Sequence, residues 1–394
     1  MPLLSVVMPT HNRQTFAAIS VAKILAACPE TEVLLSDSSS EPTLPGLLGP
    51  LLDHKRLAYI RQPCDLDVVR HFEAALSHAN GEYVVFIGDD DCVGPQIEDV
   101  AKWARLREID SVISYTDSFV ANYFWPGIRS RYYGDQYASK LFVNNFSSKA
   151  EQLDVDAAAR SALHNLGRGL GALPRVYHGL ASRALIQRVL SKHGSLFGGV
   201  SPDIYSAILL SSESQNAWHV DYPFCLPGGS PPSTSGSGAA KTDNPNLWQH
   251  SHIRSFKNLT WDPLIPEFYS PFVVWSFSAK KAVDTLRGVD WRPNLARLYA
   301  CALLYGRGQS EATEAAIACH ADRFGRAATY KAIAAEIVRE LAFQGRRFSG
   351  RVMRPGAGGG AKQIGDVPTI AAAYEALSTY CDRQGSLNLP AIQQ

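Results

Sequence analysis

The sequence predicts an α/β protein in which helices flank a mostly parallel sheet, followed by a helical C-terminal region. Over residues 3–115, short apolar strands rich in β-branched side chains alternate with segments of helical spacing, and this alternation is typical of a parallel sheet covered on both faces. After residue 266 the chain becomes Ala-rich and helical. Its 394 residues allow one large or two ordinary domains, and we expect a sheet domain at residues 1–260 and a helical region at residues 261–394.

The elements are bounded by breaks in the apolar pattern. Strands are expected at residues 3–8, 32–35, 57–60, 83–87 and 111–115. Helices or short helical turns are expected between them, at residues 14–27, 42–54, 66–79 and 95–107. Farther along we expect a strand and a helix within residues 176–193 and a helix at residues 204–210. The C-terminal helices are expected at residues 267–287, 294–305, 311–320, 327–343 and 369–381.

Charge and cysteine content argue against several classes of protein. The 38 basic and 37 acidic residues nearly cancel, so no overall field favours nucleic acid as a partner. The 7 cysteines are scattered without a CxxC pair, which suits a reducing compartment better than a disulfide framework or a zinc site. The N-terminus lacks the features of a signal peptide, and no apolar run is long enough to span a bilayer. We expect a cytoplasmic protein, and any contact with a membrane would be peripheral, at its inner face.

Three adjacent acids, Asp89, Asp90 and Asp91, directly follow the strand at residues 83–87. Open α/β sheets bind their ligands beyond the carboxyl ends of the strands. Clustered carboxylate oxygens suit hard cations such as Mg2+ or Mn2+. The alternative is that an aspartate caps the helix after Pro95, although one acid is enough for a cap. The residues therefore favour a metal site at Asp89, Asp90 and Asp91 and leave the cap as the alternative.

Polar side chains also follow other strands, at Thr10, Asn12 and Asp37. Because the carboxyl ends of parallel strands lie at one edge of a sheet, we expect these residues and the three aspartates to line one crevice. Asp203 lies near the start of the helix predicted at residues 204–210. It is either a cap or a carboxylate that points from a rigid helix end into the crevice.

Three further segments have roles that the sequence leaves open. Residues 227–241, PGGSPPSTSGSGAAK, are either a mobile active-site lid or a surface linker. The aromatic side chains between residues 123 and 137 are expected in the core or an interface rather than in an acceptor pocket. A basic patch with apolar neighbours is either a solvated face or a contact for anionic lipid headgroups; it comprises Arg346, Arg347, Arg351 and Arg354 with Phe348, Val352 and Met353.

Four segments, taken in order, resemble a known family. They are SVVMPTHNR at the first strand, LLSDSSS at the second, GEYVVFIGDDD at the aspartates and SPDIYSAI at Asp203. This set is similar to the motifs of family 2 glycosyltransferases with the GT-A fold. The resemblance covers residues 3–117 well and residues 176–241 more loosely, and it does not extend to the C-terminal helices. It implies a GT-A, Rossmann-like sheet domain that binds a nucleotide sugar.

The resemblance also implies a role for each matched residue. The nucleoside is held by Pro9, Thr10, Asn12 and Asp37, with Asp37 at the uracil or base edge. Mn2+ or Mg2+ is held at the donor diphosphate by Asp89, Asp90 and Asp91, and Asp203 matches the general base. Two departures stand out: Gly88 replaces the first acid of the family's Asp-x-Asp-Asp pattern, and the late Glu-Asp pair is Pro202-Asp203 here.

The chemistry of sugar transfer agrees with these roles. Departure of a nucleoside diphosphate builds negative charge that a cation offsets, and a carboxylate can take the proton of the acceptor hydroxyl. One base without a covalent intermediate gives inversion. Lys241, His250, His252 and Arg254 are available to steady the diphosphate if the loop closes. By analogy with the fold, the expected donor is a UDP-sugar, and the expected acceptor is a saccharide or lipid-linked saccharide in polysaccharide biosynthesis.

Two other functions stay open at this point. A sugar nucleotidyltransferase also combines an α/β sheet with carboxylates and Mg2+, but it needs a Gly-rich phosphate loop after the first strand, and PTHNR contains no glycine. A nucleotide-sugar- or saccharide-binding module without catalysis is the other alternative. It is favoured by Gly88 in the metal motif.

Overall fold

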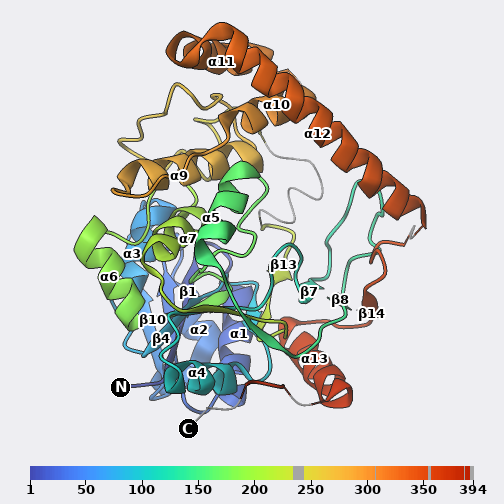
Figure 1. Ribbon diagram of the computed structural model, residues 1–394. Helices are drawn as coiled ribbons and strands as arrows, with labels where there is room; N and C mark the ends of the chain where they lie inside the picture. The colour runs from blue at the N-terminus through green and yellow to red at the C-terminus, as the bar shows by residue number, and fades with distance from the viewer. Residues whose placement is uncertain (234–243, 307, 354–355, 386, 391–394) are drawn as a thin grey trace.

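An eight-stranded sheet forms the centre of the molecule (Figure 1). The computed structural model describes residues 1–233, 244–306, 308–353, 356–385 and 387–390. The strand order is β3-β2-β1-β4-β10-β6-β11-β9. The strands are β1 (Leu4–Thr10), β2 (Thr31–Asp37), β3 (Leu57–Arg61), β4 (Tyr83–Phe86), β6 (Ser111–Ile113), β9 (Ala150–Gln152), β10 (Gly179–Ser182) and β11 (Ala217–Val220). Because only β10 and β9 run antiparallel to their neighbours, the mostly parallel α/β sheet predicted from the sequence is confirmed.

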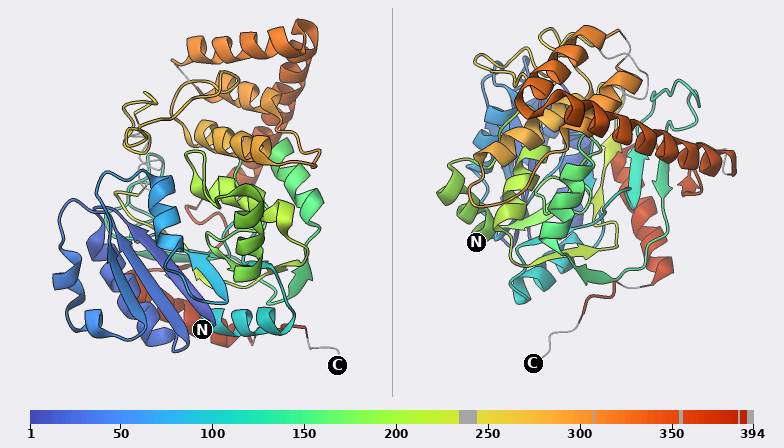
Figure 2. Two further views of the ribbon diagram at one scale, coloured as in Figure 1. Left: turned by 90° about the vertical axis from the view of Figure 1, so that its left-hand side faces the viewer. Right: turned by 45° about the horizontal axis from the view of Figure 1, so that its top comes forward.

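Helices cover both faces of this sheet because alternate strand residues are apolar on both sides (Figure 2). Val7 and Phe86 belong to one core, whereas Val6, Met8 and Val85 belong to the other. The first core is covered by α3 (Val68–Leu76), α5 (Val155–His164), α6 (Arg183–His193) and α7 (Pro202–Glu213). The second is covered by α1 (Gln14–Ala27), α2 (Leu44–Leu48), α4 (Ile97–Leu106) and the last helix, α13 (Ile370–Gln384), and the turn η1 (Gly49–Asp53) follows α2.

Two small sheets lie beside the large one. One pairs β5 (Cys92–Val93) with β12 (Cys225–Leu226), and the other has the order β13-β7-β8-β14. Its strands are β13 (Gly228–Gly229), β7 (Ala121–Phe124), β8 (Lys140–Val143) and β14 (Lys362–Ile364). Tyr123 and Trp125 are buried here, as expected for core aromatics, whereas Tyr132 is exposed. These pairings bring residues 225–229 next to the turn that holds the three aspartates.

The C-terminal helices form a layer at one end of the molecule (Figure 1). They are α9 (Pro271–Thr285), α10 (Leu295–Tyr305), α11 (Ser310–Phe324) and α12 (Arg326–Met353). The sequence places the end of α12 at residue 343, which is wrong by ten residues since Met353 is the last helical one. The reason is local: the first proline after Arg326 is Pro355, and the glycines within the helix do not stop it.

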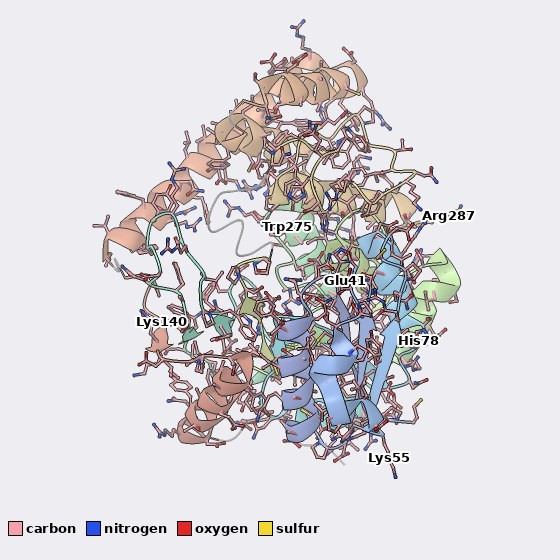
Figure 3. The ribbon with its side chains drawn as sticks, turned by 180° about the vertical axis from the view of Figure 1, so that it is seen from behind. Glu41, Lys55, His78, Lys140, Trp275 and Arg287 are labelled. Carbon is pink, nitrogen blue, oxygen red and sulfur yellow. The ribbon has the colours of Figure 1, made fainter. Side chains whose placement is uncertain are left out.

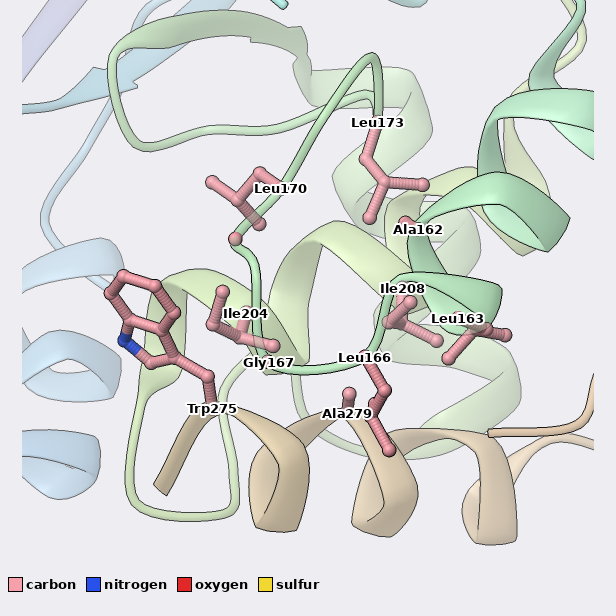
Figure 4. A pocket seen from close by; sticks show the side chains of 11 residues that line it. Ala162, Leu163, Leu166, Gly167, Leu170, Leu173, Ile204, Ile208, Trp275 and Ala279 are labelled. Carbon is pink, nitrogen blue, oxygen red and sulfur yellow. The ribbon is translucent and has the colours of Figure 1, made fainter. Parts of the chain in front are cut away.

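The layer joins the sheet domain through α9, which packs on α7, and Trp275 of α9 lies at this junction (Figure 3). An apolar cavity of about 10 Å3 remains between α5, α7 and α9 (Figure 4), which is too small for a ligand. The division at residue 260 stays a prediction. The chain after α12 returns to the sheet domain, where β14 pairs with β8 and α13 packs on α1.

All seven cysteines are free in this structure. Among the described residues, no helix has both the length and the apolar character needed to cross a bilayer.

Candidate active site

The three aspartates lie where β1 and β4 end side by side as parallel neighbours. After β4 the chain turns, and the N–H of Asp91 donates to the carbonyl of Gly88 at 3.2 Å. The Thr10 hydroxyl, at the end of β1, donates to Asp89 Oδ2 at 2.8 Å. Asp89, Asp90 and Asp91 are therefore held at the carboxyl edge of the sheet, next to Thr10, where the sequence predicts a crevice.

A guanidinium group bridges the first two aspartates. Arg13 Nη2 lies 2.8 Å from Asp89 Oδ1, and Arg13 Nη1 lies 3.5 Å from Asp90 Oδ1. The second oxygen of Asp90 accepts hydrogen bonds from the N–H and the hydroxyl of Ser230, at 2.8 and 2.7 Å. The Arg13 side chain is 26% exposed while the Asp89 side chain is fully buried, so the guanidinium reaches the carboxylates from the side open to solvent.

Asp91 is turned the other way and has both oxygens engaged. Its Oδ2 accepts the N–H of Gly88 and lies 2.6 Å from His178 Nε2, and the Tyr177 hydroxyl donates to it at 3.3 Å. Its Oδ1 accepts the N–H of Gly228 at 2.6 Å. Asp91 therefore links three segments by hydrogen bonds: the aspartate turn, the two residues that precede β10, and β13.

The environment pushes the pKa values of the three carboxyl groups apart. Burial raises the pKa of Asp89 to about 7, although Arg13 acts against this shift. Burial and then the charge of Asp91 raise the pKa of Asp90. Burial acts to raise the pKa of Asp91 as well, but His178 and the hydrogen bonds outweigh it and the pKa is lowered. Asp91 is thus stably ionised at neutral pH, whereas Asp89 and Asp90 need a cation to be ionised together.

Steric crowding explains why position 88 is a glycine. A Cβ atom there would lie 2.9 Å from Asp91 Oδ2 and 2.9 Å from the Tyr177 hydroxyl. The space that the family's first acid needs is therefore filled by the side chains of Asp91 and Tyr177. The departure at Gly88 belongs to an arrangement in which Asp91 is a structural anchor.

Asp203 lies in the first turn of α7. Burial raises the pKa of its carboxyl group, while the backbone N–H of Ile204 and the charges of His252 and His178 act against the rise. Its charge also acts on Tyr177 together with those of Asp90 and Asp91. Asp203 therefore shares its electrostatic surroundings with the aspartate turn, on the same side of the sheet.

A cleft of about 740 Å3 opens beside these groups, which is within the usual size of a small-molecule site. The residues after β1 and β2 and the start of α3 supply one wall, and the chain from Asn244 onward supplies most of the other. The lining residues include His11, Asn12, Arg13, Ser38 and His71 on the first wall and Gln249, His250, His252, Arg254 and Tyr269 on the second. His250 stacks on Tyr269. His252 lies with Nε2 2.5 Å from the carbonyl of Val200, and burial lowers its pKa.

The residues predicted to hold the nucleoside lie at the expected strand ends, but only some face the cleft. Asn12 lines it, and its Oδ1 accepts the N–H of Ser40 at 2.9 Å. Pro9 and Thr10 are buried in β1. Asp37 is fully buried at the end of β2, where Arg61 Nη1 lies 2.8 Å from its Oδ2 and the Tyr59 hydroxyl donates to the same atom at 3.1 Å. In this arrangement Asp37 orders the turn after β2, and its contact with a base stays a prediction.

The loop at residues 227–241 is described only in part. Gly228 and Gly229 form β13, which pairs with β7, and Ser230 binds Asp90. Residues 228–230 are therefore held against the aspartate turn. This part of the loop is neither a mobile lid nor a surface linker. Lys241, predicted to bind the donor, lies outside the described residues.

The donor set fits a divalent ion at two oxygen atoms. Asp89 Oδ1 and Asp90 Oδ1 are carboxylate oxygens, the type that Mg2+ and Mn2+ prefer, and both face Arg13. Asp89 Oδ1 is buried and its contact is this ion pair; it accepts no hydrogen bond from the described residues. No group of three His, Cys, Asp or Glu side chains among the described residues has the spacing of metal ligands. Since Asp91 is engaged elsewhere, an ion here must share Asp89 and Asp90 with Arg13 or displace it.

Sequence reasoning missed several groups of this site. Arg13 directly follows the motif around Thr10 and Asn12 and is a cation after a strand end, so its position could have indicated a role. His178 and Ser230 come from distant segments and are brought in by β10 and β13. No local pattern marks them in the sequence.

A family model and a solved structure match parts or all of this chain. The sequence model of the family described as Glycosyl transferase family 2 matches residues 5–155. These residues form a family 2 glycosyltransferase domain. The match includes β1, β2, β4 and the three aspartates, and the family resemblance seen in the motifs is confirmed. No curated protein matches the chain.

One solved structure shows the same fold at low sequence identity. A structure of S. aureus TarS residues 1–349 in complex with UDP-GlcNAc is similar at a TM-score of 0.50 and 11% identity, over 99% of this chain and 94% of that chain. Another structure of TarS 1–349 gives a TM-score of 0.40 at 15% identity over 57% of this chain. This alignment and that with the UDP complex span only 60% and 61% of the chains matched. At this identity the likeness shows the fold, and the GT-A class is confirmed.

Proposed function

We propose that this protein is an inverting glycosyltransferase that transfers a sugar from a nucleotide diphosphate donor, expected to be a UDP-sugar, to a hydroxyl group of a saccharide or lipid-linked saccharide. The observation that carries the proposal is the arrangement of Asp203 and the aspartate turn on one side of the sheet. Beside it lies a cleft lined by Asn12 and Arg13. The family match supports the sugar transfer itself.

Asp203 is the proposed general base. The acceptor oxygen forms a bond to the anomeric carbon while its proton passes to the Asp203 carboxylate. The bond from that carbon to the diphosphate oxygen breaks, and the diphosphate leaves with the electron pair. A raised pKa makes Asp203 a better proton acceptor than an exposed aspartate. A single displacement without a covalent intermediate inverts the anomeric centre.

Positive charge for the departing diphosphate comes from groups that line the cleft. Arg254 lines it, and Arg13 lines it while paired with Asp89 and Asp90. Lys241 is proposed to join them. Mn2+ or Mg2+, held by Asp89 and Asp90, supplies further positive charge when it is bound. We also keep the cytoplasmic location, with an acceptor at the inner membrane face, as part of the proposal.

Replacing Asp203 by Asn tests the base. Nucleotide sugars are first screened with Mn2+ for those that raise the melting temperature, because a ligand of the native state stabilises it. Release of UDP from a stabilising donor is then measured without acceptor and with saccharide acceptors. We expect Asp203→Asn to lower turnover by at least about 100-fold, in line with the effect of general bases, and to leave the donor-induced stabilisation unchanged.

Asp290→Asn is the matched control, because the Asp290 side chain is exposed and pairs with the exposed Arg292, while Arg160 contacts its backbone carbonyl. Full turnover in Asp203→Asn would refute the base assignment. Donor binding by the wild-type protein without any turnover would favour the non-catalytic module that Gly88 suggested. If no nucleotide sugar changes the melting temperature, the proposed function fails.

A further inference from the structure

Helix α12 extends beyond the body of the protein. It spans Arg326–Met353, and its C-terminal half projects away from the other helices (Figures 1 and 2). Its N-terminal half packs against α10 and α11. The helix is thus fixed at one end and presents most of its length to the surroundings.

The side of α12 that faces the body carries all of its negative charge. Glu336 and Glu340 are the only acids of the helix, and both are buried. Glu340 Oε2 lies 2.5 Å from Arg297 Nη2 and 2.7 Å from Arg168 Nη2. Glu336 pairs with Arg297 and, within the helix, with Arg339. Both carboxylates are therefore neutralised by ion pairs at the buried side.

The outer side of α12 carries a row of large apolar side chains. Tyr330, Val338, Leu341, Phe348 and Val352 are 49%, 68%, 56%, 72% and 64% exposed. Their spacing along the helix keeps them on one face, since each step is close to a whole number of helical turns. Such a contiguous apolar face is uncommon on a protein surface that meets only water.

The exposed charges that flank this row are all positive among the described side chains of α12. They belong to Arg326, Lys331, Arg346 and Arg347. An apolar face bordered by Lys and Arg on an exposed helix is the pattern of helices that lie in the interface of an anionic membrane. The apolar side chains enter the acyl boundary, and the basic ones meet the lipid phosphates.

We propose that the outer face of α12 docks this protein onto an anionic membrane surface. A second copy of the chain fits less well, because a twofold contact would bring the same basic residues of both copies together. The inference rests on α12 alone and is independent of the proposed catalytic function.

Vesicle flotation tests the proposal. The protein is mixed with vesicles of phosphatidylcholine alone or of phosphatidylcholine with phosphatidylglycerol, at low and high salt. We expect binding to the anionic vesicles only, and weaker binding at high salt because the charges are screened. Each basic residue near such a surface contributes about fivefold in partitioning (about 1 kcal/mol). Arg346→Gln with Arg347→Gln should therefore weaken binding about 25-fold.

Two further variants distinguish docking through α12 from a general effect of charge and from self-association. Phe348→Ser with Val352→Ser should abolish vesicle binding, since it removes apolar side chains that are exposed in the free protein and leaves the core intact. Lys55→Gln with Lys281→Gln removes the same charge elsewhere, with Lys55 at the opposite end of the molecule from α12 (Figure 3), and should bind as the wild type does. Equal binding by all variants, or none by the wild type, overturns the proposal. So does concentration-dependent self-association, seen by light scattering, that the Phe348→Ser and Val352→Ser variant loses.

Discussion

Asp89 and Asp91 are separated by one residue, yet replacement of each by Asn is expected to change stability in opposite directions. In the absence of metal, Asp89→Asn should stabilise the protein at pH 8, and Asp91→Asn should destabilise it. The reason lies in the two environments: burial raises the pKa of Asp89 to about 7, whereas His178 and backbone N–H groups lower the pKa of Asp91. Ionisation of Asp89 therefore destabilises the folded state, whereas ionisation of Asp91 stabilises it.

The size of the Asp89 effect follows from its pKa. A rise from 3.8 to about 7 corresponds to about 4 kcal/mol. A group with a raised pKa in the folded state gives stability that is complete below its unfolded pKa, near 3.8, and is lost as the pH rises through about 7. Asn resembles the neutral acid and avoids this loss. Removing a partner of Arg13 costs about 1–3 kcal/mol, so we expect a net gain of about 1–3 kcal/mol at pH 8 that disappears by about pH 4.

The Asp91 effect follows from the contacts that Asn cannot keep. Asn has an amide nitrogen in place of one carboxylate oxygen, and this nitrogen cannot accept a hydrogen bond from the N–H of Gly88 or Gly228. The 2.6 Å contact with His178 Nε2 also loses its carboxylate partner. Leaving a buried N–H group without its acceptor costs about 1–3 kcal/mol. Urea unfolding in the presence of EDTA measures both variants against the wild type. Equal destabilisation by both substitutions at pH 8 would show that the charge of Asp89 is as well satisfied as that of Asp91, and it would refute this account of the site.

Three further predictions test separate parts of the structure. Gly88→Ala should cost about 1–3 kcal/mol by overpacking against Asp91 and Tyr177, whereas Gly46→Ala, which meets nothing within 4 Å, should be neutral or stabilising in urea unfolding. Burial acts to raise the pKa of Glu340, but hydrogen bonds, first among them that from Arg297, lower this pKa to about 2. Glu340→Gln should therefore lower the melting temperature at pH 7, and the difference from the wild type should shrink as the pH falls from 4.5 towards 2. A difference in melting temperature that stays constant over this pH range would contradict the prediction. Arg13→Met should increase the stabilisation by Mn2+, since the ion no longer competes with the guanidinium; a smaller effect of Mn2+ would show that Arg13 helps to hold the ion.

The sheet and the location of the site could be predicted from the sequence because both depend on local signals. Apolar strands that end in Thr10 and in Asp89 to Asp91 mark the carboxyl edge, and the parallel order of β1 and β4 brings them together. The start of α7 likewise placed Asp203 at a helix end. These features need only the spacing of apolar residues and the preference of polar groups for strand and helix ends.

The different contacts of the three aspartates could not be predicted, because they depend on residues that are distant in the chain. His178 and Gly228 hold Asp91, and Arg13 bridges the other two. The same holds for the loop after residue 227, where Gly228 approaches the carbonyl of Asp90 so closely that a Cβ would lie 1.8 Å from it. The composition of the loop suggested flexibility, but the pairing of β13 with β7 fixes this part.

The most direct test of the central claim is calorimetric titration of UDP into the wild-type protein, with GDP in parallel, first with Mn2+ and then with EDTA. We expect one site that binds UDP at least about tenfold more tightly with Mn2+, a difference of about 1.4 kcal/mol, and the loss of this difference in Asp89→Asn. Binding that is unaffected by Mn2+, or no binding of either nucleotide, would contradict the claim that Asp89 and Asp90 hold a cation at the diphosphate of a nucleotide sugar.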